Sequence, residues 1–349
     1  MKNLLILQGW LPFYRKPFFN ELTKYYRVTV LHSGRPATNS GDFFSEIILP
    51  VIHFGSIRWQ TGISKVVSYQ QPDAIVAGDD LHYLAFAYAR LLVGDSVPWA
   101  WWGVDENRNL LFSQIKFKWI IRESDQLIFY DANSMSRVSR LGFDKGRLHL
   151  ANNTVFVKQN IFRRNFSTRH TFVNVGSLNS RKQNDVLIKV FAEVLRQRGR
   201  DFKLYLIGDG PEREGLRTLI RDLNLTSNVI LTGKIEDSCL LALYYSNALA
   251  SVSFGQAGLA VLQSMAYGVP FITKVNAISG GEISNIENRK TGILCEDSEL
   301  GLLNAILGVI DNPALCEEMG ANAYTYYRDQ ASVDGMVEGF RSALSYGAN

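Results

Sequence analysis

Cysteines are scarce in this chain, and long apolar runs are missing. The 349 residues include three cysteines, Cys239, Cys295 and Cys316, which lie far apart without a CxxC pair. This spacing argues against both a disulfide framework and a zinc site. No run approaches the roughly 20 apolar residues that span a bilayer, and the apolar stretch 4–7 is too short for a secretory signal. We therefore expect a cytoplasmic protein.

Strong charge and compositional bias are also absent. A formal net charge of +4 does not by itself indicate nucleic-acid binding, although it is compatible with phosphate ligands or an anionic membrane surface. A hydrophobic content of 46% and a charged content of 20% exclude a disordered chain. A chain of 349 residues is longer than a typical domain with a single hydrophobic core, so we expect two globular domains.

Short apolar runs alternate with helical patterns along the whole chain. The predicted strands lie at 4–7, 28–31, 74–77, 97–102, 126–130, 148–150, 171–175, 203–207, 229–232, 248–252, 271–273 and 291–294. This order predicts an α/β protein with two Rossmann-like, doubly wound parallel-sheet domains. The basic stretch 158–169 separates them, which gives domains 1–160 and 161–330. We expect the last helix, about 331–349, to pack back on the first domain.

In the first domain, polar residues follow the predicted strands, where ligands gather in doubly wound sheets. Asp79, Asp80 and Asp105 are the candidates for polar chemistry there. Two alternatives remain open: Asp79 and Asp80 would cap the helix that begins near Tyr83, and Asp105 would lie in a solvated loop.

Two cationic segments of the first domain each allow two interpretations. Arg15 and Lys16 mark either an exposed helix start or a contact with an acidic or phosphate-bearing acceptor. The segment 110–122 mixes large apolar residues with three cations. It would form a helix at a membrane interface or a buried helix with a cationic rim.

The stretch 254–270 combines a strand end, a glycine-containing turn and a helix. Its glycines allow a ligand to approach the backbone, and the helix start offers free N–H groups. We expect a phosphate at Gly258 and Leu259, the alternative being an ordinary turn with nothing bound.

Two further turns of the second domain suit a nucleotide diphosphate. Arg181 and Lys182 follow the Gly176 turn at a helix start, where backbone donors and fixed charge act on the same oxygens, unless the turn is merely solvated. The backbone of Gly233, Lys234 and Ile235 could pair with the edge of a base.

Four motifs occur in an order that resembles the donor-binding domain of GT-B glycosyltransferases. They span residues 175–182 (VGSLNSRK), 207–212 (IGDGPE), 231–235 (LTGKI) and 258–270 (GLAVLQSMAYGVP). The resemblance is closest to the retaining enzymes of glycosyltransferase family 4, the glycosyl transferases group 1. It implies a GT-B fold, with two Rossmann-like domains facing across a cleft.

The resemblance also implies roles for particular residues. Lys182, Arg181 and Asp105 are the expected catalytic residues, with Lys182 neutralising the donor diphosphate. The expected donor-binding residues are Gly176, Ser177, Gly208, Gly233, Lys234, Ile235, Gly255, Gln256, Ala257, Gly258, Leu259 and Gln263. The expected acceptor-side residues are Gly9, Trp10, Tyr14, Arg15, Asp79, Asp80 and Trp102. We expect neither a metal nor a cofactor, because fixed cations and helix-end dipoles can stabilise the leaving diphosphate.

The sequence departs from the family pattern at several positions. The usual pair of glutamates is replaced by Gln263 and by Gly255 or Gln256. Ser177 takes the place of an arginine, and Val104 that of a histidine.

These features predict a retaining transferase that moves a sugar from a UDP- or GDP-linked donor to a glycan or lipid-linked oligosaccharide. We expect this reaction in cell-surface polysaccharide synthesis, at the cytoplasmic face of a membrane and without nucleic acid. The alternatives are a nucleotide-sugar 2-epimerase of the same architecture and a catalytically inactive nucleotide-sugar-binding subunit.

Overall fold

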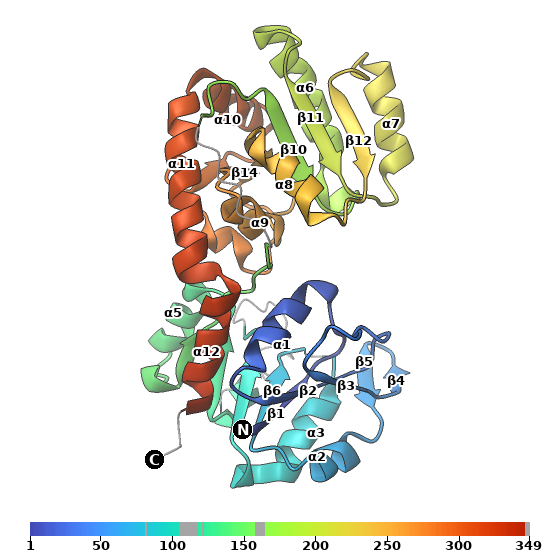
Figure 1. The fold of residues 1–349 in the computed structure, drawn as a ribbon, viewed down its shortest axis with the longest axis vertical. Helices are drawn as coiled ribbons and strands as arrows, with labels where there is room; N and C mark the ends of the chain where they lie inside the picture. Colours follow the sequence, from blue (N-terminus) through green and yellow to red (C-terminus); the bar gives the residue numbers. More distant parts are fainter. Residues whose placement is uncertain (81, 105–117, 121, 158–164, 346–349) are drawn as a thin grey trace. The chain divides into compact units, whose positions relative to one another are not determined.

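The computed structural model describes residues 1–80, 82–104, 118–120, 122–157 and 165–345. These form two compact units, residues 1–156 with 332–349 and residues 157–331. The boundary lies at 156/157, where the sequence suggested 160/161. Figure 1 labels helices and strands of both units.

The first unit is built on a seven-stranded parallel sheet. Its strand order is β3-β2-β1-β6-β7-β8-β9. The strands are β1 (Asn3–Leu7), β2 (Arg27–His32), β3 (Ser45–Ile48), β6 (Ala74–Gly78), β7 (Trp99–Trp102), β8 (Gln126–Phe129) and β9 (Leu148–Leu150). The helices are α1 (Lys16–Leu22), α2 (Ile63–Gln70), α3 (Leu84–Val93), α5 (Ala132–Arg140) and α12 (Val333–Ser345). The order reverses between β1 and β6, which makes this pair the topological switch point where ligands bind in such sheets.

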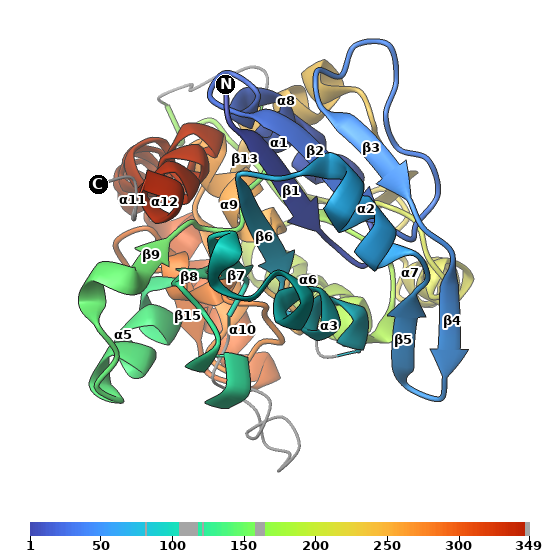
Figure 2. The same cartoon turned by 90° about the horizontal axis from the view of Figure 1, so that it is seen from below.

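Alternating residues of each strand bury both faces of this sheet. Leu4 and Ile6 pack with α1 and α12, whereas Leu5 and Leu7 pack with α2 and α3. Figure 2 shows α1 and α12 on one side of the strands and α2 and α3 on the other. Since successive side chains of a strand point to opposite faces, a continuous apolar run fits a sheet covered on both faces.

The second unit repeats this plan with six parallel strands in the order β12-β11-β10-β13-β14-β15. The strands are β10 (Thr171–Val175), β11 (Lys203–Ile207), β12 (Val229–Gly233), β13 (Ala248–Val252), β14 (Phe271–Lys274) and β15 (Gly292–Cys295). The helices are α6 (Asn184–Arg198), α7 (Arg213–Asp222), α8 (Ser238–Ser246), α9 (Ala260–Ala266), α10 (Glu299–Asp311) and α11 (Pro313–Tyr326). Here the switch point lies between β10 and β13.

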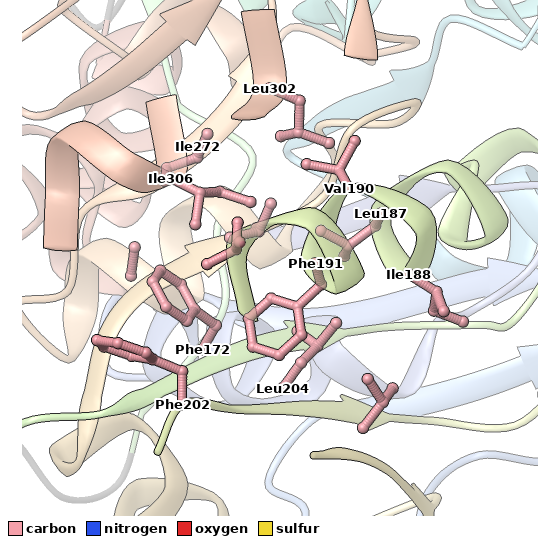
Figure 3. Close-up of a cluster of buried hydrophobic side chains, with 14 of the residues drawn as sticks. Phe172, Leu187, Ile188, Val190, Phe191, Phe202, Leu204, Ile272, Leu302 and Ile306 are labelled. Atoms are coloured by element: carbon pink, nitrogen blue, oxygen red, sulfur yellow. The ribbon is translucent and has the colours of Figure 1, made fainter. Parts of the chain in front are cut away.

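The core of the second unit fixes the helix that follows β10. Phe172 of β10 and Phe191 of α6 are fully buried and meet edge to face at 5.9 Å (Figure 3). Leu302 and Ile306 of α10 belong to the same cluster. Packing of this kind holds the start of α6, and with it the preceding turn, at the carboxyl edge of the sheet.

The two expected parallel-sheet domains are confirmed, but the sequence did not reveal several elements. It missed β3, α2, α5 and an antiparallel hairpin of β4 (Val51–Phe54) and β5 (Ile57–Gln60). No single helix of the described part is long and apolar enough to cross a membrane, although the bent pair Glu299–Asp311 and Pro313–Ser345 together satisfies length and composition.

Candidate functional site

The turn that carries Arg181 and Lys182 is held against the stretch after β13. β10 ends at Val175, and the 3-10 turn Ser180–Lys182 leads into α6. The N–H of Gly255 donates to the carbonyl oxygen of Lys182 at 3.1 Å. A Cβ atom on Gly255 would lie 2.3 Å from the Arg181 carbonyl oxygen, so only glycine permits this approach. The switch point of the second sheet therefore joins two of the motifs found in the sequence.

The Lys182 ammonium group is buried beside the end of β10 without a counterion in contact. The residue is 6% exposed, and a Cβ atom on Gly176 would lie 3.1 Å from its Nζ. It makes no hydrogen bond or ion pair with any residue that the structure describes. Burial lowers its pKa from 10.5 to about 8, although the Glu282 carboxylate acts in the opposite direction; the Arg181 charge lowers the pKa further. A buried cation that lacks a contacting anion suits an anionic ligand.

Close packing of strand ends brings three of the expected glycines together. The N–H of Gly208 donates to the carbonyl oxygen of Gly233 at 2.9 Å. A Cβ atom on Gly208 would lie 1.9 Å from the carbonyl oxygen of Gly176. This backbone contact leaves no room for a side chain at Gly208, and Gly176 in turn lies beside the Lys182 ammonium group.

The segment after Gly255 is fixed by a neighbouring loop and then opens into α9. The N–H of Ala257 donates to the carbonyl oxygen of Ile278 at 2.9 Å. The N–H groups of Gly258 and Leu259 have no acceptor among the described residues, and the space beside Gly258 is open. Helix α9 starts directly after these residues, as the sequence predicted, but it has only seven residues.

Two features of this region were not predicted from the sequence. The Glu282 carboxylate is buried, accepts the N–H of Gly280 at 2.9 Å and attracts the Lys182 ammonium group. The second feature is a set of polar atoms around the turn that are buried and have no hydrogen-bond partner in the described part of the chain: Asn179 Oδ1, Gln183 Oε1, Asn184 Oδ1 and Asn184 Nδ2. Such atoms are uncommon in folded proteins, and at a candidate binding site they are suited to a polar ligand or to water. In the sequence, the one feature that marks Glu282 is its position after two glycines, Gly280 and Gly281, in the loop that follows β14.

The other expected donor-binding or catalytic residues of the second unit differ from Lys182 in their exposure and contacts. Arg181 and Ser177 are exposed, whereas Gln256 and Gln263 are partly buried. Lys234 is exposed, and its ammonium group pairs with Glu236. Ile235 is partly buried, beside the apolar cluster that covers the second face of the sheet. Their roles stay predictions.

In the first unit, six of the seven expected acceptor-side residues line one cavity of about 150 Å³. They are Gly9, Trp10, Arg15, Asp79, Asp80 and Trp102. The cavity lies at the carboxyl ends of β1, β6, β7 and β8, which include the switch point of this sheet. Tyr14 is not part of the lining, but its ring lies 5.8 Å from the Arg15 guanidinium carbon.

Some interpretations of the first unit need correction. Asp79 and Asp80 do not cap α3, because the N-cap is Tyr83 and no side chain bonds there; Asp80 Oδ1 instead accepts the N–H of His82. Lys16 is not at an exposed helix start but is buried, 2.5 Å from Asp42. Asp105 and most of the segment 110–122 lie outside the described residues.

Within the described part of the chain, no group of three or more His, Cys, Asp or Glu side chains is arranged to hold a metal.

The second unit matches a known family. Residues 157–326 match the family model "Glycosyl transferases group 1". N-acetyl-alpha-D-glucosaminyl L-malate synthase of Bacillus anthracis is 29% identical over 168 residues, 46% of this chain and 42% of that protein. Poly(ribitol-phosphate) alpha-N-acetylglucosaminyltransferase of Staphylococcus aureus is 24% identical over 228 residues, 62% of this chain and 45% of that protein. The chain thus spans about half the length, or less, of the curated relatives it matches.

Solved structures extend the similarity to the whole fold. The Anabaena protein Alr3699/HepE, in complex with UDP, superposes with a TM-score of 0.76 at 16% identity, covering 99% of this chain and 100% of that chain. At this identity the likeness concerns the fold alone. Together with the two parallel sheets, these matches identify a GT-B fold, in which residues 157–326 match the glycosyl transferases group 1 family model.

Proposed function

We propose that this protein is a retaining glycosyltransferase that moves a sugar from a UDP- or GDP-linked donor to a glycan or lipid-linked acceptor. The observation that carries the proposal is the Lys182 ammonium group, buried and without a contacting anion at the switch point of a group 1 domain. The names of both curated relatives specify an alpha-linked product, which is what retention gives from an alpha-linked donor.

The chemistry follows from the charge that develops when the sugar leaves. Breaking the bond between the sugar and the diphosphate places additional negative charge on the phosphate oxygens. Lys182, assisted by the exposed cation of Arg181, stabilises this charge more strongly in the transition state than in the ground state. The free N–H groups of Gly258 and Leu259 would add backbone donors to the distal phosphate.

The remaining assignments complete the proposal. Gln263 would bond a ribose hydroxyl as a neutral amide, and the turn of Gly233, Lys234 and Ile235 would hold the base. The reaction would need no resident metal or cofactor, because fixed cations carry the leaving-group charge. We place it in cell-surface polysaccharide synthesis, at the cytoplasmic face of a membrane.

A donor panel tests this function. The pure protein is incubated with UDP- and GDP-linked sugars, with and without glycan acceptors, and released nucleotide is measured. We expect turnover with one donor class, an unchanged anomeric configuration in the product, and a loss on the order of 10²-fold in kcat/KM for Lys182→Met. Lys189→Met is the matched control, because Lys189 is exposed on α6, the helix that follows the Lys182 turn, and pairs with Asp185 at 3.5 Å.

Two results would contradict the transferase, and a third would contradict the role of Lys182. Inversion at C2 of the donor sugar would indicate the epimerase. Binding without turnover would indicate a nucleotide-sugar-binding subunit. Equal activity of Lys182→Met and the wild type would remove Lys182 from the site.

A further inference from the structure

The solvent-facing side of α3 carries apolar side chains, whereas the charged residue of this helix is buried. Tyr88, Leu91 and Leu92 are exposed, the two leucines at 65% and 50%. Arg90, the one charged residue in the sequence of α3, is buried, and its Nε–H donates to the carbonyl oxygen of Glu123 at 2.7 Å. Surface helices of globular proteins usually have the reverse arrangement, with charged side chains outward. The outer side of α3 is therefore suited to an apolar environment.

The hairpin of β4 and β5 extends this apolar surface. The centre of the Trp59 ring lies 5.3 Å from the centre of the Tyr88 ring. Ile52 pairs with Trp59 across the hairpin, so their side chains share one face, and both Ile52 and Phe54 are exposed. Strand β5 contacts α3, and Figure 2 shows β4 as the outer strand of the hairpin. We call this surface the α3 face; it consists of Ile52, Phe54, Trp59, Tyr88, Leu91 and Leu92.

The segments that build and border the α3 face contain basic residues but no acidic ones. Residues 51–72, which include β4, β5 and α2, and residues 81–94, which include α3, have no Asp or Glu in their sequence. Lys65 is exposed on α2, which contacts α3, and Arg58 lies on β5. Neither forms an ion pair with a residue that the structure describes. The acidic residue that follows α3, Asp95, pairs with Arg90 at 3.2 Å. The α3 face therefore combines apolar side chains with positive charge.

An anionic membrane surface fits these features better than a second copy of the chain. In a two-fold symmetric dimer the same patch meets itself, so Arg58 and Lys65 would approach the same cations of the other copy without an acidic residue between them. An anionic bilayer instead offers acyl chains to the leucines and negative head groups to the cations. Aromatic side chains such as Trp59 and Tyr88 favour the boundary between these two layers.

From this arrangement we infer that the α3 face docks the first unit on a membrane that contains anionic lipid. Phe54, Leu91 and Leu92 enter the boundary between head groups and acyl chains, and Lys65 lies among the head groups. None of these residues lines the acceptor-side cavity, so docking leaves that cavity free for its ligand. Docking is independent of the proposed function, and it would hold a transferase beside a lipid-linked acceptor.

Binding of the full chain to lipid vesicles, without donor or acceptor, tests the inference. The vesicles contain either phosphatidylcholine alone or an equimolar mixture of phosphatidylcholine and phosphatidylglycerol. The bound fraction is measured by flotation over a range of lipid concentrations. We expect partition into the anionic vesicles to be roughly tenfold or more stronger than into the neutral vesicles. High salt should reduce this difference, because it screens the attraction between exposed charges.

Variants assign the binding to the α3 face. Leu91→Ser/Leu92→Ser should lower partition into anionic vesicles roughly tenfold or more, because two apolar side chains are lost. The matched control, Leu240→Ser/Leu243→Ser, removes two leucines that are 42% and 50% exposed on α8 of the second unit, and it should bind like the wild type. Lys65→Gln should lower partition into anionic vesicles about fivefold and leave partition into neutral vesicles unchanged.

Several outcomes would overturn the inference: no binding to anionic vesicles, equal partition into neutral and anionic vesicles, or equal binding of the two serine variants. A wild-type dimer that dissociates in Leu91→Ser/Leu92→Ser, as measured by sedimentation, would assign the α3 face to a second copy instead. If that variant proves unfolded by circular dichroism, Lys65→Gln decides the question. The donor panel needs no vesicles, so vesicle binding by a protein without transferase activity would keep the membrane surface and remove only the proposed function.

Discussion

The backbone N–H of Gly255 donates to the carbonyl oxygen of Lys182 at 3.1 Å, and this bond joins the loop after β13 to the turn after β10. The two residues lie on either side of the switch point of the second sheet. Motifs that are far apart in the sequence therefore form one structural unit around the Lys182 ammonium group.

The decrease in rate at alkaline pH should reflect the deprotonation of Lys182. Because burial lowers its pKa to about 8, the free enzyme loses this charge as the pH rises through that value. We expect kcat/KM to fall above about pH 8, approaching roughly tenfold per pH unit. In Lys182→Arg the charge persists, so this limb should disappear; an identical limb in Lys182→Arg would assign it to another group.

The same residue should lower the stability of the folded state. A lysine pKa that falls from 10.5 to about 8 on folding corresponds to a cost of about 3 kcal/mol at about 1.4 kcal/mol per pKa unit. This cost is fully present below pH 8, where the lysine is protonated in both states. It decreases between pH 8 and 10.5, where the unfolded state binds more protons.

Lys182→Met should therefore unfold at higher denaturant concentration than the wild type at pH 7. The difference between the two proteins should decrease as the pH rises to 10.5. A wild type more stable than Lys182→Met at pH 7 would show that the ammonium group is not buried at a cost.

Two glycines of the same loop should respond differently to alanine. A Cβ atom on Gly255 would lie 2.3 Å from the Arg181 carbonyl oxygen, so Gly255→Ala should reduce the free energy of unfolding by about 1–3 kcal/mol. A Cβ atom on Gly258 would meet nothing within 4 Å, so Gly258→Ala should stay within about 0.5 kcal/mol of the wild type. Both variants should bind nucleotide more weakly, as measured by titration. Equal stability of the two variants would contradict the close contact at Gly255.

The buried pair of Lys16 and Asp42 should matter for the first unit. The two groups lie 2.5 Å apart and are almost inaccessible. Asp42→Asn would leave the Lys16 charge buried without compensation, at a cost of about 3 kcal/mol. The double variant Lys16→Met/Asp42→Asn should recover most of this loss in chemical denaturation, and no recovery would show that the cost has another origin.

The order of the elements and the positions of the strand ends could be predicted from local sequence. Apolar runs such as those of β1 and β10 encode parallel strands, and the glycines that follow them mark the ligand edge. The hairpin β4–β5 escaped prediction because its strands have only four residues each, too few for a clear apolar period, and β4 is largely exposed.

Long-range contacts explain the remaining errors. Nothing near Lys16 in the sequence indicates that Asp42 would bury it, and nothing near Lys182 indicates Glu282. Likewise, Gln8 and Tyr130, the neutral hydrogen-bond partners of Arg15, directly follow β1 and β8. Tertiary packing creates these environments, so residue types and spacing alone do not reveal them.

Titration of the pure protein with UDP and with GDP tests the central claim most directly. We expect one of the two to bind the wild type and Lys189→Met equally well. Lys182→Met should bind it roughly tenfold or more weakly, as expected for the loss of a charge-assisted hydrogen bond. Equal affinity of Lys182→Met and the wild type, or no binding of either nucleotide, would contradict the assignment of a nucleotide diphosphate site to this turn.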